Sequence, residues 1–209
     1  DSVLYLRDRG SDTTWNISAN SCVGTISIKK ERAGDTVNLT QDTKVLTVHT
    51  QDAGTGSAVN GVRVLVLAAS GGPYPYQVAV SISRSGSTAT VSHTGHGLVT
   101  GHQVVIAGCN EGEYNGLFTI AKINNDSYSY TVTGTPATPA TGSPVSTFVI
   151  VTGTTAGGGD ITSTARAYSS SQPYSGTARY AAGSYKASPI SGSITAATQT
   201  VNIPMISDA

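Results

Sequence analysis

The sequence predicts an all-β protein, a β-sandwich interrupted by a smaller β-module. Three observations predict this fold class. Apolar and polar residues alternate with a period of two along much of the 209-residue chain, sustained helical periodicity is absent, and 24 glycines punctuate the alternating segments. Alternation with period two is typical of strands that bury one face, and glycine supplies the turns between them.

Residues 1–43 are predicted to form an N-terminal β-segment or partial domain. Short alternating stretches separated by turn residues predict four strands, at residues 3–7, 14–17, 25–29 and 36–39. The set is incomplete as a domain, so we interpret it as part of a small sandwich or as a docking arm. The chain begins at Asp1 without methionine and shows no signal peptide, which suggests a processed form, a fragment or the ordered part of a longer protein.

Residues 44–77 together with 146–209 are predicted to form the main sandwich. Alternation predicts its strands at residues 45–51, 61–69, 146–152, 161–168, 174–180 and 201–206. Residues 61–69 are the most apolar stretch and are expected to lie centrally. The order of strands and Gly-rich turns resembles the seven-stranded sandwiches of Ig-like and transthyretin-like domains, which run to about 80–100 residues. That length is reached only if residues 78–145 are removed.

Residues 78–145 are therefore interpreted as an inserted small β-module. Its four predicted strands are residues 88–93, 103–107, 116–123 and 127–133. Pro73 and Pro75 precede it, and a Pro/Ala/Thr tract at residues 135–142 closes it. Surface insertions are tolerated because each doubling of loop length costs only about 0.6 kcal/mol. The alternative is one continuous sandwich with a long hairpin.

Composition limits the classes of partner. Charged residues make up 11% of the chain, against about 25% on average, and twelve basic residues balance twelve acidic ones. A neutral chain without a basic run has no electrostatic footprint for nucleic acid or an anionic membrane. No apolar run reaches the roughly 18 residues of a membrane span. Cys22 and Cys109 fall in different predicted units, which favours free thiols over a disulfide, and no cofactor is predicted.

Three histidines are the first candidates for chemistry. His93, His96 and His102 have a spacing that could bind Zn²⁺. They lie among glycines at a strand end, however, and a turn in which Leu98 enters the module core explains His96 better. We expect a structural turn and no metal site.

Glu111 and Glu113 are the closest pair of acidic residues. In an extended segment they would share one face and could do acid–base chemistry or contribute to a Ca²⁺ loop. The Gly/Asn-rich surroundings favour solvated side chains instead. The neighbouring Tyr114, Asn115 and Gly116 suit a hairpin turn, with Tyr114 packed across the strand pair. No catalytic residues are predicted, and we expect a protein that is not an enzyme.

Tyrosines concentrate in the main sandwich and in the stretch before the insertion. Most are expected to pack across strands. Tyr74 and Tyr76, flanked by prolines, are the two expected to be exposed and are the candidate residues for an interface or a glycan contact.

Four motifs of the module carry a resemblance to a known class of domains. They are Gly86-Ser87-Thr88-Ala89-Thr90-Val91, His96-Gly97-Leu98-Val99-Thr100-Gly101, Glu113-Tyr114-Asn115-Gly116-Leu117-Phe118-Thr119-Ile120 and Tyr128-Ser129-Tyr130-Thr131-Val132. Together they cover about a third of the chain. The module resembles one found in virion and tail-associated proteins of tailed bacteriophages, although His102 stands where those domains often have Asp. Such modules have no catalytic residues to carry over.

The resemblance implies a non-enzymatic structural protein on the surface of a phage-like virion, as a capsid decoration, fibre or tail component that displays the module. Its expected partners are copies of itself, with a trimer plausible, and other virion proteins. The alternative is a carbohydrate-binding or host-adhesion sandwich that contacts a host-surface glycan. A glycan-cleaving or peptidoglycan-cleaving enzyme is the third and least supported hypothesis.

Overall fold

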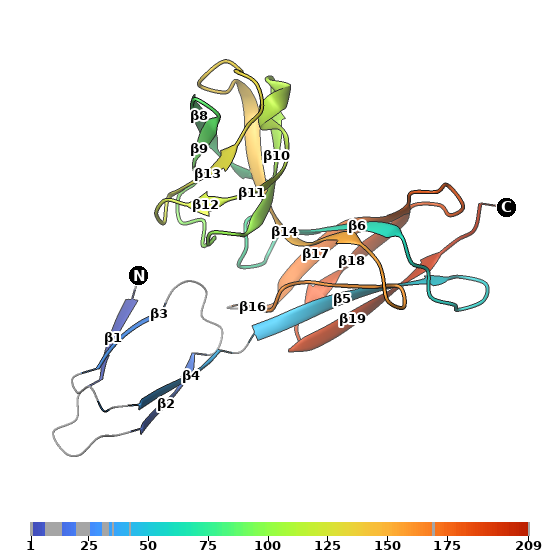
Figure 1. Cartoon of the computed structure of the whole chain (residues 1–209), viewed down its shortest axis with the longest axis horizontal. Coiled ribbons are helices and arrows are strands. Elements are labelled where there is room, and N and C mark those ends of the chain that lie inside the picture. Colours follow the sequence, from blue (N-terminus) through green and yellow to red (C-terminus); the bar gives the residue numbers. More distant parts are fainter. Residues whose placement is uncertain are drawn as a thin grey trace.

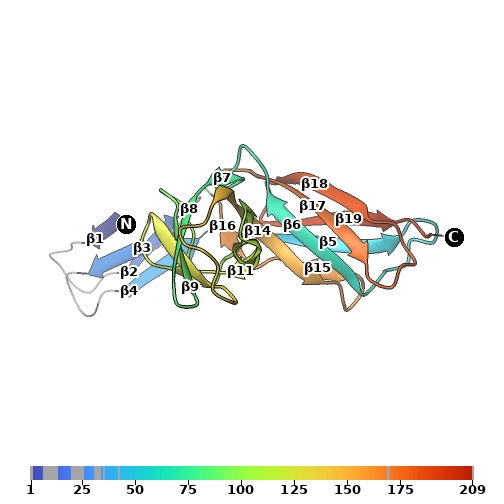
Figure 2. The same ribbon diagram turned by 90° about the horizontal axis from the view of Figure 1, so that it is seen from above.

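The all-β fold is confirmed. The computed structural model describes residues 2–6, 14–19, 26–30, 34, 36–41, 43–168 and 170–208, and all further statements concern these residues. The described elements are strands, apart from a single 3-10 turn, η1 (Gly112–Tyr114). Four N-terminal strands lie at one end of the molecule, and the remaining strands form two connected sandwiches (Figures 1 and 2).

The N-terminal strands pair in parallel. They are β1 (Ser2–Leu6), β2 (Thr14–Ala19), β3 (Ile26–Lys30) and β4 (Thr36–Gln41). β1 pairs with β3, and β2 pairs with β4. The chain therefore makes one circuit through β1 and β2 and lays a second circuit, β3 and β4, beside the first. This N-terminal coil differs from the antiparallel hairpins that a small sandwich requires, because parallel neighbours cannot be joined by a tight turn.

A short internal repeat explains this coil. The strand Thr14-Trp15-Asn16-Ile17 lies in register with Thr36-Val37-Asn38-Leu39, so that threonine faces threonine and asparagine faces asparagine. Like positions stack when successive circuits of a coil have equivalent sequences. The repeat is only a few residues long and was not recognised from the sequence.

The larger sandwich, called the host, is formed by two facing sheets. One contains β6 (Val62–Ala68), β17 (Gln172–Tyr180), β18 (Ser188–Ile194) and the second half of β14 (Gly142–Thr154). The other centres on β5 (Thr43–Asp52), which pairs with β15 (Asp160–Thr162), β16 (Arg166–Ala167) and, in parallel, β19 (Thr198–Met205). Alternate residues of β6, from Val62 to Ala68, are buried, as expected for its central position.

The module is a second, smaller sandwich. One of its sheets contains β7 (Val78–Ala79), the first half of β14, β10 (Gln103–Cys109) and β11 (Gly116–Thr119). The other contains β8 (Ser81–Ser85), β9 (Thr88–Ser92), β13 (Ser127–Thr131) and β12 (Ala121–Lys122). Figure 1 shows these strands rising from the host at the point where β14 leaves it.

Strand β14 belongs to both sandwiches. Its residues up to Phe148 pair with β10 and β7, and its residues from Val149 onward pair with β6. Six consecutive residues, 146–151, are buried, which the alternating pattern of a one-sided strand cannot produce. The predicted boundary between residues 145 and 146 falls inside this strand, and the buried side chains of module and host form one continuous cluster.

Two predicted strands are each interrupted. The predicted strand at 161–168 is divided into β15 and β16. Between them the Ser163 N–H still donates to the Leu46 carbonyl at 2.8 Å, but the Leu46 N–H donates to the Ser163 hydroxyl at 3.0 Å. The predicted strand at 116–123 is divided into β11 and β12, with buried Ile120 turning the chain from one sheet of the module to the other.

Strands β7, β8 and β18 are not among the predicted strands. β18 reads Ser-Pro-Ile-Ser-Gly-Ser-Ile, a sequence rich in turn residues. It lies at the edge of its sheet, where a proline removes no required ladder hydrogen bond. Packing of Ile190 and Ile194 into the core, rather than strand propensity, therefore fixes this strand.

Close approach of β17 and β6 gives a testable prediction at Gly176. A Cβ atom added there would lie 2.1 Å from the Leu65 carbonyl oxygen and 2.8 Å from the Val66 Cα, both backbone atoms. We expect Gly176→Ala to destabilise the protein by roughly 1–3 kcal/mol, because a packed interior resists added volume. Gly112→Ala is the matched control, since a Cβ at Gly112 meets nothing within 4 Å. Equal midpoints of urea unfolding for the two variants would contradict this account.

Candidate functional site

The segment that joins β6 to β7 lies where the module meets the host, and we call residues 69–77 the linker. Its Tyr74 ring stacks on Phe148 of β14, with 4.2 Å between centroids and an interplanar angle of 17°. Tyr168 of the host and His102 of the module meet the same ring edge-on, at 5.3 and 5.8 Å. These four rings, the junction cluster, come from the linker, the shared strand, the host and the module.

Burial of Tyr74 corrects one expectation. Tyr74 was predicted to be exposed, but only 5% of it is accessible. Its backbone N–H also donates to the Gln172 side-chain oxygen at 3.0 Å. The proline-flanked sequence concealed this role, because only the fold brings Phe148 and Tyr168 against it. The prediction that Tyr74 is exposed is therefore wrong.

Arg166 closes the junction cluster from the host side. Its guanidinium carbon lies 5.0 Å from the centroid of Phe148, a distance suited to a cation–π contact. Burial lowers the pKa of Arg166 and raises that of Tyr168. The Arg166 Nε and the Tyr168 hydroxyl have no hydrogen-bond partner among the described residues. The cluster is held by ring packing rather than by polar pairs.

Tyr76, by contrast, is exposed as predicted, with 38% of it accessible. The backbone on both sides of it is fixed. The Pro75 carbonyl accepts a hydrogen bond from the Phe148 N–H at 2.9 Å, and the Gln77 N–H donates to the Thr147 hydroxyl at 3.1 Å. Gln77 has a φ of 46°, a left-handed conformation rare for a residue with a side chain. The linker therefore presents the Tyr76 ring from a restrained backbone.

The turn at residues 93–96 of the module faces the linker. The Asp126 backbone carbonyl accepts from the His93 N–H and its carboxylate accepts from the Gly95 N–H, both at 2.8 Å. The His96 Nε2 donates to the Asn124 carbonyl at 2.9 Å, and the His96 Nδ1 accepts from the Leu98 N–H at 2.9 Å. His96 thus shapes the turn, and Leu98 is fully buried.

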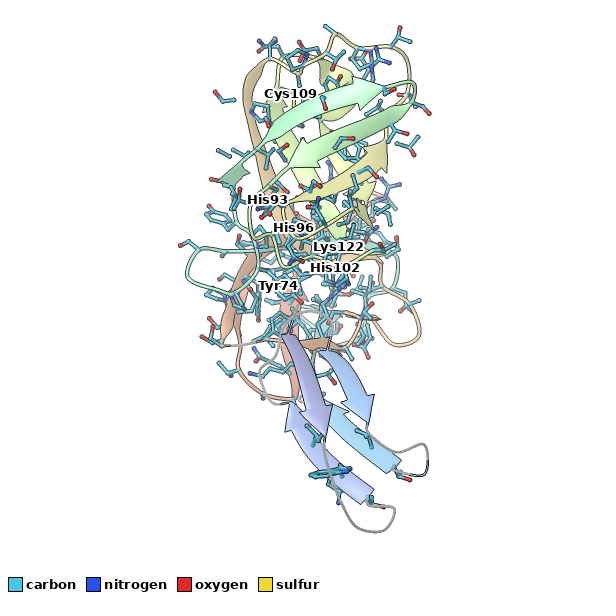
Figure 3. The ribbon with its side chains drawn as sticks, turned by 90° about the vertical axis from the view of Figure 1, so that its left-hand side faces the viewer. Tyr74, His93, His96, His102, Cys109 and Lys122 are labelled. Carbon is cyan, nitrogen blue, oxygen red and sulfur yellow. The ribbon has the colours of Figure 1, made fainter. Side chains whose placement is uncertain are left out.

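A groove of about 380 Å³ lies between the linker and this turn. Its walls are residues 69–76, Val78 and residues 93–96. Figure 3 shows Tyr74, His93, His96 and His102 at the end of the module nearest the host, with Cys109 at the far end. The groove is the candidate site. Sequence reasoning identified its Tyr76 but missed His93 as a lining residue, because nothing in the sequence places residue 93 beside residue 76.

The histidines do not form a metal centre. No group of three His, Cys, Asp or Glu side chains within the described part of the chain is arranged to hold a metal ion. His93 and His96 have ring centroids 5.7 Å apart, but His102 packs on Tyr74 and Phe148 in the junction cluster. Burial is the main cause that lowers the pKa of His93 to about 4 and that of His102 to about 3.

The acidic pair lies at the 3-10 turn η1, with Glu111 just before it and Glu113 within it. The Glu111 carboxylate accepts hydrogen bonds from the Thr141 N–H at 2.8 Å and from the Thr141 hydroxyl at 2.7 Å, which lowers its pKa. η1 separates Glu111 from the strand, so the extended segment expected here does not form. Asn115 has a φ of −84°, so the predicted Asn-Gly hairpin turn is also wrong.

Tyr114 and Asn115 instead hold the loop together. The Tyr114 hydroxyl donates to the Ala137 carbonyl at 2.8 Å, and the Asn115 side chain bonds the backbone N–H and carbonyl of Cys109. Cys109 is a free, buried thiol whose pKa is raised by burial. Cys22 lies outside the described residues.

Comparison with known proteins assigns no family. No protein family matches the chain. No curated protein sequence matches it. Among solved structures, a mutant of the shaft pilin SpaA from Lactobacillus rhamnosus GG aligns at a TM-score of 0.35 with 12% identity, covering 87% of this chain and 53% of the pilin.

A second solved structure, the endosialidase of phage phi92, aligns at a TM-score of 0.29 with 13% identity, covering 79% of this chain and 42% of the enzyme. The chain thus spans only about half the length of the pilin. TM-scores and identities this low establish neither a family nor an activity. The described part of the chain also has no helix long and apolar enough to cross a membrane.

Tyr74 and Tyr76 make a matched pair for a stability test. We expect Tyr74→Ala to destabilise the protein by about 3–5 kcal/mol, the usual range for removing a buried ring. Tyr76→Ala is expected to change stability by no more than about 0.5 kcal/mol, because its ring is exposed. Urea unfolding of both variants measures the difference, and similar losses would show that Tyr74 does not hold the junction.

The buried histidines predict a loss of stability in mild acid. Because the folded state lowers the pKa of His102 from 6.5 to about 3, unfolding takes up a proton between these values. The contribution of the buried neutral histidines to the free energy of unfolding is complete above about pH 6.5 and declines as the pH falls towards 4. With solvent screening allowed for, we expect on the order of 1 kcal/mol per histidine to be lost by about pH 5.

His102→Gln separates this effect from general acid sensitivity. The glutamine does not titrate and can still accept from the Val99 N–H, which bonds the His102 Nδ1 at 3.3 Å. Unfolding measured between about pH 7 and pH 5 should be less pH-dependent in the variant. An unchanged dependence would mean that His102 is not the titrating group.

Proposed function

We propose that this protein is a non-enzymatic structural component of an extracellular particle, and specifically of a phage-like virion. In this proposal residues 1–43 assemble copies of the chain, the host (residues 44–77 plus 146–209) is the scaffold, and the module (residues 78–145) is displayed. A capsid decoration, a fibre and a tail component all fit this division.

The observation that carries the proposal is a partly exposed apolar stripe on the N-terminal coil. Trp15, Ile17 and Val37 occupy alternate positions on paired strands, and each remains partly exposed. Thr14 and Thr36, on the opposite face, are exposed. A two-stranded sheet is marginally stable alone, and an apolar stripe in it needs a cover.

We infer that other copies of the same chain cover this apolar stripe. Each copy carries an identical stripe, and closed rotational symmetry allows identical faces to meet around one axis. A trimer is the arrangement we expect. Open edges of the parallel pairs could add strands from neighbouring copies or from other virion proteins in the same way.

The resemblance of the module to phage virion domains provides the second support. Its motif residues have structural roles. Leu98 fills the core, Asn115 fastens the loop to Cys109, and Tyr128 donates to the buried Ser146 hydroxyl at 2.8 Å. Residues that hold the fold together, rather than react, are those a display module needs.

Assembly is tested with Trp15→Lys and its neighbour on the other face, Thr14→Lys. We expect the wild-type chain to sediment as an oligomer and Trp15→Lys as a monomer. Thr14→Lys should sediment like the wild type, because residue 14, unlike residue 15, lies on the opposite face from the apolar stripe. The melting temperature should be nearly unchanged, because the host and module cores are separate from the coil. A monomeric wild-type chain would overturn the assembly proposal.

The virion assignment needs a separate measurement. Mass spectrometry of particles purified from a producing culture should find peptides of this chain in fixed ratio to capsid or tail proteins. Antibody labelling in electron micrographs should then place the module on the particle surface. Absence of the chain from purified particles would refute this part of the proposal.

A further inference from the structure

The groove between the linker and the turn at residues 93–96 is not explained by assembly. It is lined by residues of the linker and of the module, and by none of the N-terminal coil. Its volume of about 380 Å³ is within the range of roughly 300–1,000 Å³ that small-molecule sites occupy.

The linker wall is preorganised. Tyr74 is stacked on Phe148, Pro75 accepts from the Phe148 N–H, and Gln77 is held at positive φ by Thr147. These contacts fix the residues on either side of Tyr76 and leave its ring exposed. Backbone strain of this kind persists only where surrounding contacts enforce it, and it concentrates at functional sites.

The opposite wall contains a polar group without a partner. His93 is only 4% accessible, and its Nδ1 has no hydrogen-bond partner among the described residues. Most buried side-chain polar atoms have a partner, so an unpaired one in the wall of a groove points to a ligand. Thr94 and Ser70 add hydroxyl groups to the same lining.

The lack of charge on the groove lining favours a neutral ligand. None of the side chains that line the groove is formally charged, and burial lowers the pKa of His93 to about 4, which keeps its ring neutral near pH 7. An anionic ligand would therefore find no counter-charge. A neutral imidazole has one donor and one acceptor nitrogen, which matches hydroxyl groups that both donate and accept.

We propose that the groove binds a neutral sugar unit of a glycan, with the sugar ring lying on Tyr76 and a sugar hydroxyl bonding the His93 imidazole. An exposed aromatic ring combines a flat apolar face with a polar tip, which suits a ring that carries C–H groups on one face and hydroxyls at its rim.

Binding is tested with the full chain on an array of neutral hexose and N-acetylhexosamine oligosaccharides and of sialylated ones. The neutral oligosaccharide that binds most strongly on the array is then titrated calorimetrically into the wild-type protein and the variants. We expect Tyr76→Ala and His93→Phe each to weaken binding about ten-fold or more. His93→Phe keeps a ring against Tyr128, whose centroid lies 5.9 Å from that of His93.

Ile206→Ala is the matched control, because Ile206 is an exposed apolar residue just beyond β19, outside the groove lining. It should bind like the wild type, and unchanged melting temperatures confirm that all variants are folded. The proposal is overturned if no neutral glycan binds, if only sialylated glycans bind, or if binding survives Tyr76→Ala. The glycan-binding results can be interpreted even if the assembly test at Trp15 fails, because the two tests change different residues.

Discussion

One strand, β14, serves two sandwiches, and the rest of the molecule is arranged around that constraint. Its first half completes a sheet of the module and its second half completes a sheet of the host. Because a continuous β-strand cannot pivot freely within two ladders, the module is held by the hydrogen bonds of the sheets rather than by a flexible tether. The buried stretch at 146–151 marks the crossing point.

The junction cluster follows from this shared strand. Phe148 is the residue at which β14 changes sheet. The rings of Tyr74 and His102 pack on it, and Tyr168 packs in turn on Tyr74. Stacked and edge-on aromatic pairs add roughly 0.5–1.5 kcal/mol each beyond the burial of their surface. The same packing restrains the linker, so the exposed ring of Tyr76 depends on the buried ring of Tyr74.

The N-terminal coil is built differently from the two sandwiches. Its parallel strands pair residues from successive circuits, and equivalent sequences put threonine, asparagine and apolar positions in register. Trp15, Ile17 and Val37 of these strands remain partly exposed, which is why the proposed assembly concerns this segment. The buried side chains of the host and the module, by contrast, form one continuous core.

The sequence by itself determined the all-β class, most of the strands, and the burial of Leu98 in a turn, because period-two alternation and glycine positions are local properties. Only the tertiary structure decided that Tyr74 is buried while Tyr76 is exposed, that β14 crosses the predicted boundary, and that His93 faces the linker. These depend on contacts between residues far apart in the chain. Two proline-flanked tyrosines look alike in sequence, and a stacked Phe148 beneath one of them separates their roles.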